Sequence, residues 1–157
     1  MIVQGNQYFF GKAGEEVETL PVGVYTIEMP PMAELRLVKQ VDFKPIDLFG
    51  ESNNIIKTVI SYKNSTEKNF GCIFEGQSGM GKTQTIKKLC LDLNLPVILI
   101  KHAIHADIIK QVVNMINTDC IVFIDEFEKI YDSIEVQNSL LGFLDGFETK
   151  NRILTFV

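Results

Sequence analysis

Residues 76–83 read GQSGMGKT, and this stretch restricts the possible folds more than any other part of the chain. It fits the pattern GxxxxGK followed by serine or threonine. An apolar run at 70–74 precedes it and a stretch with helical spacing at 82–93 follows it, so the sequence predicts a strand, a loop and a helix. Glycines let such a loop wrap around an anion, because its backbone N–H groups and the start of the helix then face that anion. The sequence therefore predicts a phosphate-binding loop.

This loop supplies most of the residues expected to bind a nucleotide. We expect Lys82 to reach the β- and γ-phosphates, and the hydroxyl of Thr83 to complete the coordination of Mg²⁺. ATP and Mg²⁺ are thus the predicted cofactors. The residues predicted to contact the nucleotide here are Gly76, Gln77, Ser78, Gly79, Met80, Gly81, Lys82, Thr83 and Gln84.

A second signal is an apolar run that ends in two carboxylates, the CIVFIDE of residues 120–126. The carboxyl ends of parallel strands border the ligand crevice, so Asp125 is expected beside the phosphates, where it would hold Mg²⁺. Glu126 is then placed to orient and deprotonate an attacking water. A water-activating base favours hydrolysis over transfer to a small molecule, and Glu126 and Lys82 are the predicted catalytic residues.

The pattern of the chain changes near residue 45. Residues 1–45 hold short alternating stretches broken by glycine and proline, which predict a small β-rich N-terminal element. Residues 46–157 alternate apolar runs with helical stretches, which predicts an α/β domain with a parallel sheet between two helical layers. The strands are expected at 70–74, 97–100, 120–124 and 152–157, and the helices at 53–62, 82–93, 107–116 and 135–144.

Three motifs in this order resemble the AAA ATPases, a family of P-loop NTPases. They are the Walker A loop at 76–83, the Walker B strand continuing as IDEFEKIY at 124–131, and the LLGFLDGF segment at 140–147 ahead of a fourth core strand. The resemblance covers residues 46–157. It looks closest to AAA ATPases of tailed bacteriophages, and it is also similar to the mitochondrial AAA chaperone that assembles respiratory complexes.

The resemblance implies an ATP hydrolase that forms a ring, typically a hexamer, and remodels a protein or nucleoprotein partner. It also implies that residues 46–50, including Phe49 and Gly50, line the adenine pocket, although this stretch could equally be a plain linker. A nucleotide-dependent loader of DNA replication, which shares the same core, is a weaker alternative. Another alternative is a non-catalytic nucleotide-binding module, inert or interfering with ring assembly.

The sequence departs from the family pattern in three places. The segment KHAIHA at 101–106 lacks the aromatic residue and glycine of a substrate-threading loop. The sequence stops within the fourth strand, before the positions of the family's sensor, arginine finger and lid, so we expect an incomplete copy of a larger ATPase. Without a fifth strand, the family's sheet order leaves the strand before the phosphate loop at an edge.

Composition bears on partners and compartment. The net charge is −5, with 15 Lys plus Arg against 20 Asp plus Glu, which gives no indication of direct nucleic-acid binding. The chain shows neither a membrane-spanning apolar run nor the layout of a signal peptide. The three cysteines lie in apolar runs and are interpreted as buried hydrophobes. His102 and His105 are interpreted as solvated or pore-facing rather than zinc-binding. We expect a cytoplasmic protein, in the host cytoplasm if a phage encodes it.

Overall fold

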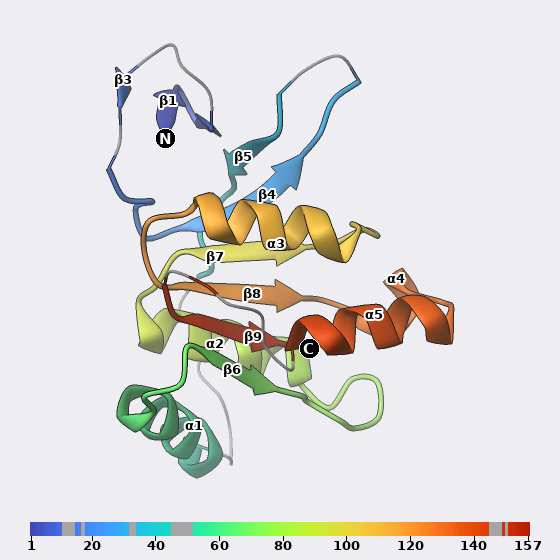
Figure 1. The fold of residues 1–157 in the computed structure, drawn as a ribbon. Helices are drawn as coiled ribbons and strands as arrows, with labels where there is room; N and C mark the ends of the chain where they lie inside the picture. The colour runs from blue at the N-terminus through green and yellow to red at the C-terminus, as the bar shows by residue number, and fades with distance from the viewer. Residues whose placement is uncertain (11–14, 17, 32–33, 45–51, 145–148, 150) are drawn as a thin grey trace.

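A computed structural model describes residues 1–157 except 11–14, 17, 32–33, 45–51, 145–148 and 150 (Figure 1). Its fourteen elements, in chain order, are β1 (Ile2–Gln4), β2 (Gln7–Phe9), β3 (Glu15–Glu16), β4 (Val24–Glu28), β5 (Arg36–Lys39), α1 (Ser52–Asn64), β6 (Asn69–Cys72), α2 (Lys82–Leu93), β7 (Val97–Ile100), α3 (Ala106–Met115), β8 (Cys120–Ile124), α4 (Phe127–Ile130), α5 (Ile134–Leu144) and β9 (Ile153–Phe156). Within these residues, no helix is both long and apolar enough to span a bilayer.

The strands form one sheet in the order β3-β1-β2-β5-β4-β7-β8-β9-β6. From β4 through β7, β8 and β9 to β6 every neighbouring pair is parallel, whereas the strands on the far side of β4 pair antiparallel. The central strands β7, β8 and β9 are buried along their whole length. Such strands need no polar alternation, which explains their continuous apolar sequences.

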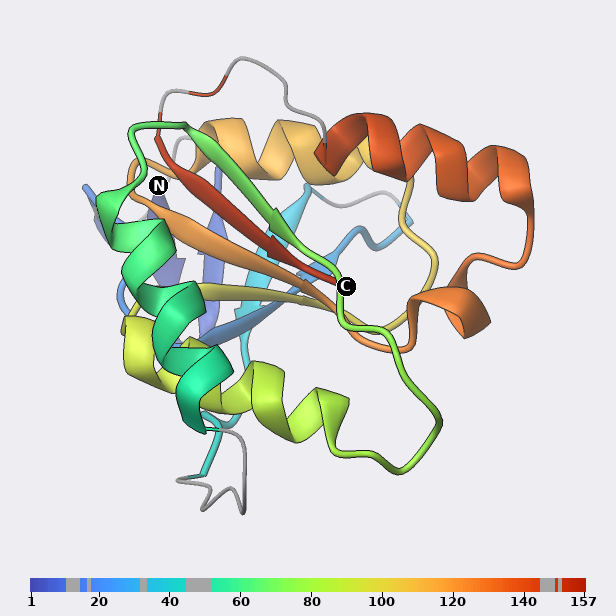
Figure 2. The same ribbon diagram turned by 90° about the horizontal axis from the view of Figure 1, so that it is seen from below.

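Helices cover both faces of the parallel part of the sheet, as Figure 2 shows. On one face, α3 contributes Ile109, Val112 and Val113 to a cluster that contains Ile98 and Val122 of the central strands. On the other face, residues of α1 and α2 form a second cluster with the alternate side chains of these strands, including Tyr62, Ile86, Leu89, Leu99 and Phe123. The predicted three-layer α/β core is therefore confirmed.

The N-terminal element continues the sheet of the core. β4 pairs antiparallel with β5 and parallel with β7, with Tyr25 opposite Ile98. Tyr25 is fully buried, and its ring meets that of Tyr8 edge to face at 5.2 Å. The boundary predicted at residue 45 lies outside the described residues, and the division into two domains stays a prediction.

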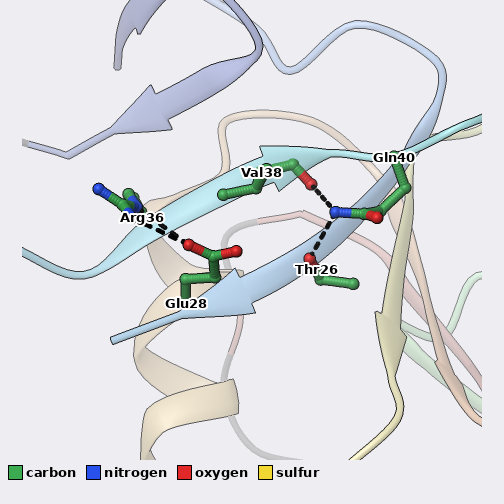
Figure 3. A network of polar contacts seen from close by, with 5 residues as sticks. All are labelled: Thr26, Glu28, Arg36, Val38 and Gln40. Carbon is green, nitrogen blue, oxygen red and sulfur yellow. Dashed lines mark hydrogen bonds and ion pairs between the residues drawn. The ribbon is translucent and has the colours of Figure 1, made fainter. Parts of the chain in front are cut away.

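Polar side chains of β4, of β5 and of the residue after β5 form a network of hydrogen bonds (Figure 3). The guanidinium of Arg36 donates to the carboxylate of Glu28 at 3.0 Å. The side-chain amide of Gln40 donates to the hydroxyl of Thr26 at 2.9 Å and to the carbonyl of Val38 at 3.3 Å. The contacts of Arg36 with Glu28 and of Gln40 with Thr26 join the two strands and support their pairing.

The strand ahead of the phosphate loop lies at a sheet edge, as predicted. Among the described residues β6 pairs only with β9, and it ends at Cys72 rather than at the predicted Phe74. Ile73 is 60% exposed. Cys90 and Cys120 are buried as predicted, but Cys72 is only partly covered, because an edge strand lacks a neighbour on one side.

Candidate nucleotide site

The loop between β6 and α2 contains backbone conformations that glycine adopts most readily. Gly79 and Gly81 have φ of 84° and 82°, and Gly76 has φ of 147°. Gly81 is the residue directly before the first turn of α2, which begins at Lys82. A side chain at Gly79 or Gly81 would be strained because L residues rarely occupy this region. The glycines of the motif therefore give the loop its path around the start of the helix.

Lys82 folds back over this loop. Its ammonium donates to the carbonyl oxygens of Gly76 and Gln77, the latter at 3.1 Å. No carboxylate among the described residues forms an ion pair with it. Within the described part of the chain, carbonyl dipoles are thus the partners of this positive charge, and an incoming phosphate can replace them with a stronger, charge-assisted partner.

Thr83 and Asp125 meet although they are far apart in the sequence. Thr83 lies in the first turn of α2 and Asp125 directly follows β8. The hydroxyl of Thr83 donates to the carboxylate of Asp125 at 3.0 Å. The backbone N–H of Asp125 donates to the carbonyl of Ile100 at 3.2 Å, which extends the β7–β8 pairing by one residue. These two oxygen-bearing groups are hard donors of the kind that Mg²⁺ prefers, so they fit a magnesium ion.

Glu126 occupies a special backbone position at the start of α4. Its φ of 56° and ψ of 45° are left-handed, which is uncommon for a residue other than glycine. Its carboxylate forms an ion pair with the ammonium of Lys129, and both side chains are more than half exposed. The hydrogen bond from Lys129 to Glu126 raises the pKa of the lysine. The carboxylate is therefore solvent-accessible but held by a cation.

The remaining predicted residues divide into exposed and undescribed ones. Four residues of the loop and first helical turn are exposed and thus accessible to a ligand, namely Gln77, Ser78, Met80 and Gln84. Phe49 and Gly50, predicted for the adenine pocket, lie outside the described residues. On the segment after β7, His105 Nδ1 lies 3.5 Å from the carboxylate of Asp107, and both side chains are highly exposed.

Sequence reasoning missed Tyr131, which lies five residues after Glu126. Tyr131 is 2% exposed, and its hydroxyl contacts the backbone of Ile104. Its ring centroid is 5.4 Å from that of Phe127, one helical turn earlier. The spacing of the two aromatic residues was visible in the sequence, but nothing there indicated that the Tyr131 hydroxyl contacts Ile104, in the segment after the adjacent strand β7.

Comparison with protein families gives one match. Residues 72–157 match the family described as ATPase family associated with various cellular activities (AAA). The matched range contains the phosphate loop, Asp125 and Glu126. No curated protein matches the chain.

Proposed function

Because the chain belongs to the AAA family of ATPases, we propose that it binds ATP with Mg²⁺ at the loop of residues 76–83 and hydrolyses it. The family supports ATP binding and ATPase activity in general. The observation that carries the site assignment is the hydrogen bond of 3.0 Å between Thr83 and Asp125. It brings together a hydroxyl from the helix after the phosphate loop and a carboxylate from the end of β8, which is separated from β6 by β9 in the sheet.

Each residue has a distinct role in the proposed reaction. Lys82 leaves the loop carbonyls and binds the terminal phosphates, where its charge offsets the negative charge that develops in the transition state. Thr83 and Asp125 hold Mg²⁺, which would supply further charge compensation on the phosphates. Glu126 accepts a proton from the attacking water and orients it, once its carboxylate has separated from Lys129.

At the level of the assembly, we propose a ring-forming ATPase that remodels a protein or nucleoprotein partner. The resemblance of residues 124–131 and 140–147 to AAA ATPases of tailed bacteriophages and to the mitochondrial assembly chaperone supports this. A cytoplasmic location belongs to the same proposal. In such rings an arginine supplied by a neighbouring subunit increases turnover by about 10³–10⁵, so slow hydrolysis by separate chains is expected.

Two substitutions separate binding from hydrolysis. Lys82→Ala removes the phosphate-binding ammonium and is expected to weaken ATP binding by about 10–100-fold, the effect of losing a charged hydrogen-bond partner. Glu126→Gln keeps the shape of the site but removes the base, so ATP affinity should stay within about threefold while turnover falls by about 10²–10⁴. Lys88→Ala is the matched control, because Lys88 lies on the same helix and pairs with Asp92 at the surface.

The measurements are equilibrium binding of a fluorescent ATP analogue and release of inorganic phosphate. Unchanged turnover in Glu126→Gln would refute the assignment of the base. Tight binding by Lys82→Ala would refute the assignment of the phosphate loop. Binding of ATP by the wild-type chain without any turnover would favour the alternative, a non-catalytic nucleotide-binding module.

A further inference from the structure

The hydroxyl of Tyr131 makes two hydrogen bonds to a single residue on another element. It accepts from the backbone N–H of Ile104 at 3.2 Å and donates to the carbonyl of Ile104 at 2.9 Å. Both residues are buried, with 2% exposure for Tyr131 and 9% for Ile104. Buried backbone groups need partners, so this one hydroxyl satisfies both polar groups of Ile104. Tyr131 therefore fixes the chain between β7 and α3.

A second contact fixes the same segment at its other end. The N–H of Asp125 donates to the carbonyl of Ile100, the last residue of β7, at 3.2 Å. Residues 101–103 between the two attachment points are exposed. We name residues 101–103 the β7 loop. Each end of this loop is thus hydrogen-bonded to the stretch from Asp125 to Tyr131, which contains the proposed base.

The stretch between Glu126 and Tyr131 is a single closed helical turn. The N–H groups of Lys129 and Ile130 donate to the carbonyl of Glu126 at 2.8 and 3.1 Å, and that of Tyr131 donates to the carbonyl of Phe127 at 2.9 Å. Figure 2 shows this turn, α4, beyond the end of β8. These three backbone hydrogen bonds connect the residues at the start of the turn with those at its end. The first residue is Glu126 in the left-handed region, and the last is Tyr131.

We propose that Tyr131 is a positioning residue that couples the conformation of the β7 loop to the position of Glu126 in the nucleotide site. The coupling rests on the proposed function. When the terminal phosphate of ATP is bound, Glu126 leaves Lys129 to reach the attacking water. This changes the backbone at the start of α4. The turn carries the change to Tyr131, and its hydroxyl carries it to Ile104. Conversely, a partner that moves the β7 loop changes hydrolysis.

Tyr131→Phe tests this coupling, because it removes the hydroxyl and keeps the ring against Phe127. Tyr25→Phe is the matched control. Tyr25 is also fully buried, and its hydroxyl donates to the carbonyl of Pro21 at 2.8 Å, within the N-terminal element. Each variant loses one buried tyrosine hydroxyl, with two hydrogen bonds in Tyr131→Phe and one in Tyr25→Phe, so both should lose some stability. Only Tyr131→Phe should lose the coupling.

The readout is amide hydrogen exchange in a peptide containing residues 101–104, with and without a non-hydrolysable ATP analogue and Mg²⁺. In the wild-type chain we expect the analogue to change the amide exchange rate of residues 101–104 by about threefold or more. A threefold change in rate corresponds to less free energy than one hydrogen bond contributes. In Tyr131→Phe this response should vanish while affinity for the analogue stays within about threefold. In a preparation with measurable turnover, kcat should fall and KM should stay near the wild-type value.

Three distinguishable outcomes would contradict the coupling, and one of them would also contradict the proposed function. A full nucleotide response of the β7 loop in Tyr131→Phe would overturn the coupling and leave the proposed function intact. The same loss of response in Tyr25→Phe would show that any buried hydroxyl has this effect, which would also overturn it. Failure of the wild-type chain to bind the analogue would overturn the proposed function and the coupling together.

Discussion

The N-terminal element can be tested as part of the core by replacing Leu37, a residue of β5, with alanine. Leu37 is fully buried, and it belongs to the same apolar cluster as Ile98 and Ile109 of the core. Because β5 pairs with β2 and β4 and not with a central core strand among the described residues, a loss of packing at Leu37 should shift the unfolding of the core helices only if both parts unfold together. We predict that the N-terminal element and the core unfold together.

The magnitude follows from the burial of the side chain. A fully buried leucine contributes about 1.5–3 kcal/mol by transfer from water, and a Leu→Ala change in a core costs about 2–5 kcal/mol when the cavity is included. We therefore expect Leu37→Ala to lower the free energy of unfolding by about 3 kcal/mol. With a urea dependence of about 2 kcal/mol per molar, the midpoint should fall by about 1.5 M.

Urea unfolding followed by far-ultraviolet circular dichroism is the decisive assay. All described helices lie between residues 52 and 144, so the helical signal reports on the core and not on the element that is mutated. Val41→Ala is the control, because the Val41 side chain is 86% exposed and its loss should change stability by less than about 0.5 kcal/mol. A helical transition that does not move in Leu37→Ala would show that residues 1–45 unfold as a separate unit.

Three further predictions concern the site and the thiols. Thr83→Ala should weaken Mg²⁺-dependent ATP binding by about 10–100-fold, and Thr83→Ser should restore it; equal affinities in a titration of Mg²⁺ would contradict the assigned ligand. In the native chain a thiol reagent should modify Cys72 first, and Cys90 and Cys120 only after denaturation, as peptide mass mapping would reveal. Burial raises the pKa of Cys90 and of Cys120 from 9.0 to about 12. The unfolded thiols thus ionise first, so stability should fall as pH rises from about 9 towards 12, measured by urea unfolding; a constant stability over this range would contradict the burial of these groups.

The helices and core strands were predictable because their patterns are local. The helix at 82–93 and the strands at 97–100 and 120–124 agree with the structure to the residue. A strand buried on both faces has a continuous apolar run, and a helix buried on one face has apolar residues at helical spacing. Both patterns can be recognised in a short window of sequence, so these elements were predictable. The meeting of Thr83 and Asp125 was also predictable, since the carboxyl ends of parallel strands lie at one edge.

The parts that were missed depend on contacts between distant residues. The parallel pairing of β4 with β7 joins Val24 to Val97, and no local pattern indicates such a partner. The strand β1 is three residues long and α4 is four, too short for a recognisable period. The left-handed backbone conformation of Glu126 could not be predicted, because no glycine, asparagine or proline nearby indicates a turn. Tertiary structure decides all of these.

The edge position of β6 has a consequence for biosynthesis. The strand that precedes the phosphate loop pairs, among the described residues, only with β9, with Asn69 opposite Ile153. A nascent chain on the ribosome has therefore produced the entire phosphate loop long before the strand beside it exists. Pairing β6 with β9 brings together segments that are far apart in the sequence, and such pairing is slow relative to the formation of local helices. ATP should thus be a ligand of the finished fold, and it should stabilise the chain only after β9 has emerged and docked.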